Sequence, residues 1–219
     1  MYRLISDLKM SQLLPDTNST RHILMVTAEE IMAEQGLELP PLHVIASEAG
    51  LKNKDAVQYH FRDRSGLIHA ILNKRAEAIS LRRGELLLEA AAQDMLKNVG
   101  ALIEAMYLPI IEQVGPTHKR APARFLLLAM TQAWASNSMA FLPDVQEDPN
   151  TNRILSLLEG LLPHLSRQRL SWRLRVQTRT ILTCLVENDN FCRQGVGATS
   201  EDELMVEALK MIEGAIASS

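Results

Sequence analysis

The sequence predicts an all-α fold, and three observations support this prediction. Helix-forming residues such as Leu, Ala, Met, Glu and Arg are plentiful, whereas aromatic residues make up only 4% of the chain. The 10 glycines and 9 prolines fall where helices would begin or end. Apolar residues recur at helical spacing along most of the chain. With 219 residues, of which 47% are hydrophobic, the chain is long enough for one large or two small helical domains.

The first third of the chain is predicted to form a loose N-terminal arm and then four helices. Ser19 and Thr20 are suited to cap the first helix, and Gly36 is suited to end it. Two prolines then interrupt the chain, and proline is accepted in the first turn of a new helix. The predicted helices cover residues 20–35, 42–49 and 54–60, and a longer one begins near Ser65.

The remainder of the chain is predicted to form longer helices with few breakers. Each of these segments carries an apolar stripe of the kind that a helix buries. The predicted helices cover residues 98–114, 121–138, 150–165, 167–192 and 201–217.

Positive charge is concentrated in one segment of an otherwise slightly acidic chain. The net charge of −3 argues against a chain-wide nucleic-acid coat. Between Lys52 and Arg83, however, eight basic residues face three acidic ones. An excess of this kind fits a phosphate-binding surface, and it also fits a solvated helix face.

The stretch "DAVQYHFRDRSGL" divides into residues that can be buried and residues that must point outward. Ala56, Val57 and Phe61 fill the one face that a short helix can bury. Gln58 and Tyr59 are left for solvent or a ligand, and Gln is a natural partner of adenine edges in the DNA major groove. Tyr59 could instead pack against the following helix.

Three stretches together resemble the TetR (tetracycline-repressor-like) family of bacterial transcriptional regulators. They are "TRHILMVTAEEIMAEQG", "IASEAG" and "AVQYHFRDRSGL", and the resemblance covers residues 20–67. It implies a helix-turn-helix DNA-binding domain over 20–66, a connecting helix over 67–84, and an effector-binding and dimerisation domain over 85–219. Residues 1–19 would be the flexible arm.

The resemblance implies DNA contacts from the second helix of the helix-turn-helix and the turn before it. The chain departs from the family at Pro40 and Pro41, where a capping Thr or Ser often touches a phosphate, and we expect that contact to be absent. One extra residue in the turn brings two further side chains toward the DNA. The expected DNA-binding residues are Lys52, Asn53, Lys54, Gln58, Tyr59, His60 and Arg64.

The family also implies a small-molecule effector, and the segment 121–141 is where we expect it. This segment carries one charge, Arg124, so its helix should be nearly surrounded by protein. An apolar effector would suit such surroundings, although methionines at helical spacing are more often part of a plain core. The candidate ligand-binding residues are Met106, Tyr107, Arg124, Phe125, Met130 and Trp134.

The last two predicted helices are the expected dimer interface. Apolar residues recur along both, and four such helices, two from each subunit, would form a bundle around a two-fold axis. The alternative is that these stripes pack within one chain. The residues concerned are Leu170, Leu174, Ile181, Leu185, Met205, Ala208, Leu209, Ile212 and Ile216.

Other classes of function lack residues to support them. Cys184 and Cys192 are too few for a disulfide framework or a structural zinc site, although they could form a redox pair. We expect no metal, no cofactor and no enzymatic activity, because the known nucleophile, phosphate-loop and zinc motifs are missing. No segment of the sequence is apolar enough to span a membrane, and a cytoplasmic location is expected.

The sequence therefore predicts a homodimeric repressor that binds a palindromic double-stranded operator and is released by a small apolar ligand. The alternative is an all-α small-molecule carrier or scaffold whose helix-turn-helix no longer binds DNA.

Overall fold

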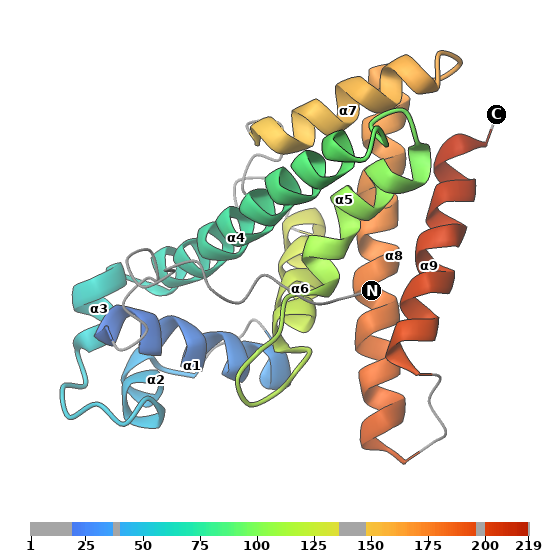
Figure 1. Cartoon of the computed structure of the whole chain (residues 1–219). Coiled ribbons are helices and arrows are strands. Elements are labelled where there is room, and N and C mark those ends of the chain that lie inside the picture. The colour runs from blue at the N-terminus through green and yellow to red at the C-terminus, as the bar shows by residue number, and fades with distance from the viewer. Residues whose placement is uncertain (1–18, 37–39, 136–147, 196–199, 219) are drawn as a thin grey trace.

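The computed structural model describes residues 19–36, 40–135, 148–195 and 200–218. These residues form nine α-helices and no strand, so the all-α prediction is confirmed for them (Figure 1). The predicted arm lies outside the described residues, apart from Ser19. The helices are α1 (Thr20–Gln35), α2 (Leu42–Glu48), α3 (Ala56–Phe61), α4 (Arg64–Ala92), α5 (Val99–Ile111), α6 (Ala121–Ala135), α7 (Pro149–Leu161), α8 (Arg167–Arg193) and α9 (Glu201–Ala217).

Helix boundaries differ from the prediction at the ends of α5 and α7, which stop at Ile111 and Leu161 rather than at residues 114 and 165, and at the start of α3. Helix α3 begins at Ala56 rather than at residue 54. The side-chain Oδ1 of Asn53 accepts a hydrogen bond from the backbone N–H of Asp55 at 3.0 Å. This local bond holds residues 53–55 in a turn, because an Asn side chain competes with the helical backbone for its N–H groups. Lys54 therefore lies in the turn that precedes α3.

The first of two hydrophobic clusters joins α1, α2, α3 and the first half of α4. Its members are fully or almost fully buried, and Leu24, Val57 and Leu67 come from three different helices. Two residues of α6, Phe125 and Ala129, complete the cluster. The short helices α2 and α3 depend on this packing, because helices of six or seven residues are not stable alone.

The second and larger cluster is built around α5. This helix carries a single charged residue, the exposed Glu104, and contacts α4, α7, α8 and α9, so most of its surface is buried. Figure 1 shows α5 enclosed by these helices, with α8 and α9 antiparallel along one side. Helix α4 contributes to both clusters, through Leu67 and Ile71 to the first and through Ile79 and Leu87 to the second.

A buried ion pair connects α4 to α1 inside the first cluster. Glu29 is buried, and its two carboxylate oxygens accept hydrogen bonds from Nε and Nη2 of Arg75 at 2.7 and 2.5 Å. The Nη1 of Arg75 also donates to the Gln113 side chain at 2.9 Å. Two parallel bonds of this kind fix direction as well as distance, so Arg75 sets the angle between α1 and α4.

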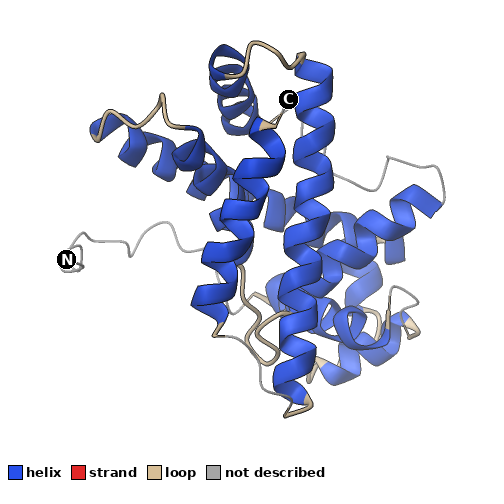
Figure 2. Ribbon diagram, turned by 90° about the vertical axis from the view of Figure 1, so that its right-hand side faces the viewer, coloured by secondary structure: helices blue, strands red, loops and turns tan. Residues whose placement is uncertain are grey.

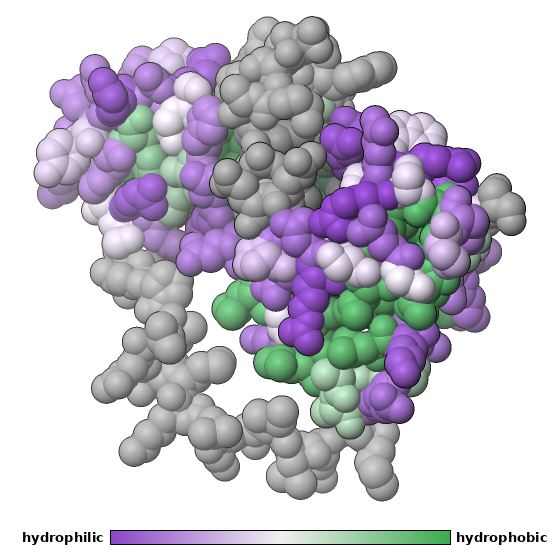
Figure 3. All heavy atoms as spheres, turned by 90° about the horizontal axis from the view of Figure 1, so that it is seen from above, coloured by the Kyte–Doolittle hydropathy of each residue, from purple (hydrophilic) through white to green (hydrophobic). Residues whose placement is uncertain are grey.

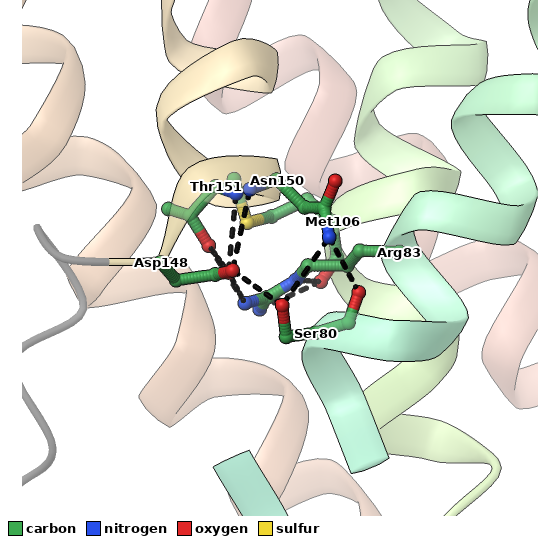
Figure 4. Close-up of polar contacts among 6 residues, drawn as sticks. All are labelled: Ser80, Arg83, Met106, Asp148, Asn150 and Thr151. Atoms are coloured by element: carbon green, nitrogen blue, oxygen red, sulfur yellow. Dashed lines mark hydrogen bonds and ion pairs between the residues drawn. The ribbon is translucent and has the colours of Figure 1, made fainter. Parts of the chain in front are cut away.

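A second buried arginine connects α4 to α5 and α7 (Figure 4). Arg83 donates from Nε and Nη2 to the carbonyl oxygen of Met106 at 3.2 and 3.1 Å, and from Nη1 to the Thr151 hydroxyl at 2.8 Å. Its Nη1 also lies 3.3 Å from Oδ2 of Asp148. Asp148 is the N-cap of α7 and accepts a further bond from the Ser80 hydroxyl. One carboxylate therefore caps α7 and neutralises a buried guanidinium.

The last two helices pack largely within the chain. Leu170, Leu174, Ile181 and Leu185 of α8 are buried in the larger cluster, and so are Met205, Ala208, Ile212 and Ile216 of α9. Leu209 is partly buried against the same cluster. The apolar stripes that we expected between subunits are thus part of the core of one chain. Other apolar residues of α8 and α9, described below, are the exposed ones.

The buried stripe of α9 leads to a prediction about Ile212. Ile212 is 1% exposed, whereas its neighbour Met211 is 66% exposed. Replacing Ile212 with Glu would bury a carboxylate without a partner, and we expect the free energy of unfolding to fall by more than about 3 kcal/mol. The control Ala215→Glu, at an exposed position of α9, should change it by less than about 1 kcal/mol. Chemical denaturation of both variants measures this difference, and a folded, stable Ile212→Glu protein would contradict the assignment of this stripe to the core.

A further prediction concerns the pH dependence contributed by Asp148. Burial by itself raises the pKa of this carboxyl, but hydrogen bonds from Ser80 and Thr151 and the charge of Arg83 outweigh burial and hold the pKa below its usual value of 3.8. A carboxyl with a lowered pKa in the folded state stabilises the fold above its unfolded-state pKa. That contribution is lost as the pH falls through the folded-state pKa.

Asp148→Asn should accordingly lower the free energy of unfolding at neutral pH by about 3 kcal/mol, because Arg83 loses its counter-charge. The difference in the free energy of unfolding between variant and wild type should narrow as the pH falls through the folded-state pKa of Asp148, which lies below 3.8. Urea denaturation across pH measures both effects. The control is Asp94→Asn, since Asp94 is exposed and Asn accepts its positive φ of 55°. A gap that does not depend on pH would show that the charge of Asp148 is not what stabilises the junction.

Candidate nucleic-acid interface

Helices α2 and α3 contact each other at the end of the molecule that is farthest from α8 and α9 (Figure 1). Helix α2 begins after Pro41, which caps it without a side-chain hydrogen bond. Helix α3 buries Ala56, Val57 and Phe61, as its sequence pattern predicted. The guanidinium carbon of Arg21 in α1 lies 5.1 Å from the centroid of the Phe61 ring, on its face. One side of α3 is therefore held firmly.

The other side of α3 carries the residues that the sequence analysis selected. Tyr59 is 83% exposed, so its packing against α4, the alternative considered for it, is wrong. Its ring meets the ring of His60 edge to face, with centroids 5.0 Å apart, and His60 is half-buried. Six of the seven residues expected to contact DNA are exposed: Lys52, Asn53, Lys54, Gln58, Tyr59 and Arg64.

A tight turn centred on Arg62 joins α3 to α4. Arg62 has φ 68° and ψ −54°, and the N–H of Asp63 donates to the carbonyl of Phe61 at 2.9 Å. These values define a γ-turn with positive φ, which is rare and strained for a residue with a side chain. The turn places Arg62 on the surface beside α3. Arg62 was not among the expected DNA contacts, because no local pattern distinguishes a γ-turn from a helix end.

The γ-turn requires the glycine that follows it. A Cβ atom built on Gly66 would lie 2.1 Å from the carbonyl oxygen of Phe61, so the backbones of α3 and α4 meet directly at this point. The Asp63 side chain caps α4 by accepting from the N–H of Gly66 at 2.8 Å. The sequence "RDRSGL" thus encodes the turn, the cap and the close approach together.

The charges around this exposed face are mainly positive. Lys52, Lys54, Arg62 and Arg64 are exposed, while the nearby acidic residues are Asp55 and Asp63. The Asp63 carboxylate already serves as the cap of α4. A polyanion approaching α3 would therefore meet four cations at its edges and the polar side chains of α3 in the middle.

The candidate ligand-binding residues do not gather in one place. Met106 and Tyr107 belong to the larger cluster, and Met130 packs against it, whereas Phe125 belongs to the smaller one. The buried hydroxyl of Tyr107 donates to the carbonyl of Leu174 at 2.9 Å, and burial raises the pKa of Tyr107. Arg124 forms an ion pair with Asp189 of α8 at 2.8 Å. The side chain of Trp134 lies outside the described residues.

The described part of the chain contains no group of three or more His, Cys, Asp and Glu side chains placed to hold a metal ion. None of its helices combines the length and the apolar character needed to cross a bilayer.

A comparison with the models of known protein families gives no match for this chain, and a comparison with curated proteins gives none either.

The close approach at Gly66 makes a prediction with an internal control. Gly66→Ala would push the new methyl group into the Phe61 carbonyl, and we expect the free energy of unfolding to fall by more than about 2 kcal/mol. Gly214 lies in α9 with nothing within 4 Å of the position of its Cβ. There the same substitution should raise the free energy of unfolding by about 0.5–1 kcal/mol through helix propensity. Thermal or urea denaturation measures the change in the free energy of unfolding for both variants. Equal changes in the two variants would contradict the tight contact between α3 and α4.

Proposed function

We propose that this chain is a DNA-binding transcriptional regulator of the TetR-like type, in which α2 and α3 form the helix-turn-helix. The observation that carries the proposal is the division of α3 into two sides. Ala56, Val57 and Phe61 hold the helix in the first cluster, while Gln58 and Tyr59 project from it. A tyrosine that is this exposed on a six-residue helix contributes little to stability, and its side chain is accessible to a partner.

The chemistry of the exposed residues suits the major groove of duplex DNA. Helix α3 is roughly 9 Å long, so its whole length fits into a groove about 12 Å wide. Gln58 can bond both the donor and the acceptor on an adenine edge. Lys52 and Lys54 at the start of α3, and Arg62 and Arg64 at its end, would meet phosphates on the two sides of the groove.

A palindromic operator requires a two-fold dimer, and exposed apolar residues on the last two helices support one. Trp172 is 62% exposed on α8, and Val206 and Met211 are exposed on α9. Figure 2 shows α8 and α9 side by side on one face of the molecule. Seen from above, hydrophobic side chains also reach the surface in the centre and right of the view (Figure 3). Large exposed apolar residues of this kind are typical of protein interfaces.

An effector would act by shifting the protein between conformations that bind DNA well and poorly. Helix α4 would carry the change, because Arg75 ties it to α1 and Arg83 ties it to α5 and α7. The apolar character of the effector stays a prediction.

Two substitutions on the outer side of α3 test the proposal. Lys54→Ala removes a charge and Tyr59→Phe removes one hydroxyl, and neither residue belongs to a hydrophobic cluster. Each should weaken specific DNA binding by about 1–3 kcal/mol while leaving the melting temperature unchanged. Genomic fragments selected by the wild-type protein provide the DNA, and gel shifts at several salt concentrations give the affinities.

The control is Lys97→Ala, because Lys97 is an exposed lysine in the turn between α4 and α5. It should not change DNA affinity. If the wild-type protein enriches no genomic fragment, the DNA-binding proposal is wrong and the small-molecule carrier becomes the better interpretation. If it binds DNA and neither variant weakens the complex, the contacts lie elsewhere than on α3.

A further inference from the structure

An acidic residue lies directly before α3, on the exposed and mainly positive face described above. Asp55 is exposed, and so are the neighbouring cations Lys52, Lys54 and Arg62. A carboxylate at this position lowers the positive potential of the surface and would repel the phosphates of a bound duplex. Its presence beside the outward side chains of α3 therefore requires an explanation.

The carboxylate of Asp55 has no structural role within the described residues. Asp55 holds the N-cap position of α3, but its side chain accepts no capping hydrogen bond. It forms no ion pair with the described residues either, although cations lie nearby in the sequence. Asp63, the other acidic residue of this face, does cap its helix, since it accepts from the N–H of Gly66 at 2.8 Å. The carboxylate of Asp55 is therefore accessible to a partner, whereas that of Asp63 is already used.

The backbone of Asp55, by contrast, is held at both of its polar groups. Its N–H donates to Oδ1 of Asn53 at 3.0 Å, and its carbonyl accepts from the N–H of Tyr59 at 2.9 Å. These two bonds fix the direction in which the side chain leaves the backbone. A group that is positioned before binding loses little conformational freedom when it meets its partner. Asp55 thus combines a fixed position with an accessible carboxylate.

The major groove of DNA offers a carboxylate few favourable contacts. Guanine presents the acceptors O6 and N7, and thymine presents the acceptor O4, so both repel it. Adenine presents the donor N6, but its acceptor N7 lies beside that donor. Cytosine presents the N4 amino group and no acceptor of its own. A carboxylate therefore distinguishes cytosine from the other three bases.

We propose that Asp55 determines specificity by accepting a hydrogen bond from the N4 amino group of a cytosine, next to the base pair that Gln58 contacts. Residues three apart lie on the same side of a helix. Three positions span about 4.5 Å along its axis, and base pairs are about 3.4 Å apart, so the two side chains reach neighbouring base pairs. Because Gln58 suits adenine, each half-site of the operator contains a C·G pair beside an A·T pair. This inference rests on the proposed DNA-binding function and names two bases of the operator.

Selection from a library of randomised DNA duplexes tests the assignment, with the full chain as wild type and with two variants. The wild type should enrich sites that contain the C·G pair beside the A·T pair, and replacing that C·G pair should weaken its binding about fivefold or more. Asp55→Ala should lose the preference at this base pair and keep the rest of the site. Asp55→Asn should shift the preference toward A·T, because an Asn side chain bonds both N6 and N7 of adenine.

The matched control is Glu48→Gln, which removes one negative charge from an exposed position at the end of α2. Loss of a negative charge by itself strengthens the binding of all DNA sequences alike. Glu48→Gln should therefore leave the base preference unchanged, as the Asp55 variants should not. Melting temperatures show whether each variant is folded. A purely structural role of Asp55 would change the melting temperature and leave the preferred base the same.

The outcomes separate this inference from the proposed function. If the wild type selects a defined sequence and both Asp55 variants select the same one, the assignment of Asp55 is overturned and the DNA-binding function stands. The same holds if the Asp55 variants and Glu48→Gln alter affinity equally without altering the preferred base, because the carboxylate then acts only through its charge. If the wild type selects no sequence, the proposed function and the role of Asp55 are both overturned.

Discussion

Helix α4 can join the two hydrophobic clusters only because each arginine that it buries meets a carboxylate. Arg75 is paired with Glu29 of α1, and Arg83 is paired with Asp148 at the start of α7. A buried guanidinium without such a partner would cost several kcal/mol, and the helix would have to turn these positions outward. Because both pairs are also hydrogen-bonded in specific directions, they determine where α1 and α7 lie around α4. The apolar contacts along α4 stabilise the packing, and the two ion pairs fix the positions of α1 and α7 relative to α4.

Most of the helices could be predicted from the sequence, because caps, breakers and apolar periodicity agree there. Helix α1 has a capping serine, a buried stripe and Gly36 with a positive φ of 89°, and its predicted bounds are those observed. The start of α3 was predicted two residues too early, because the Asn53 side chain accepts a hydrogen bond from the N–H of Asp55 and does not cap the helix. The stripes of α8 and α9 were recognised, but a stripe shows only that a face is buried. Whether the same chain or a second one covers it depends on the packing around α5, which no local pattern contains.

The candidate interface on α3 was predictable residue by residue, since burial of Ala56, Val57 and Phe61 leaves the intervening positions exposed. A cavity between the segment before α6 and the C-terminal half of α8 could not be predicted in this way. Its walls come from residues some 65 positions apart, and Arg120 has no sequence feature that announces a buried cation. Arg124 was selected as a polar residue in an apolar segment, and its partner Asp189 could not be identified without the structure. Long-range charge pairing of this kind depends on tertiary contacts rather than on periodicity.

The two-sided construction of α3 also bears on how such a protein can change over time. The residues that secure this helix and the residues that it displays are different, and they point in opposite directions. Exchanges at positions 58 and 59 therefore leave the fold almost untouched, since surface substitutions away from special features alter stability by only about 0.5 kcal/mol. New outward side chains can be tried there one at a time, in nature or in a combinatorial library, without first compensating for lost stability. Gly66 and the three buried residues of α3 are the fixed framework around that variable surface.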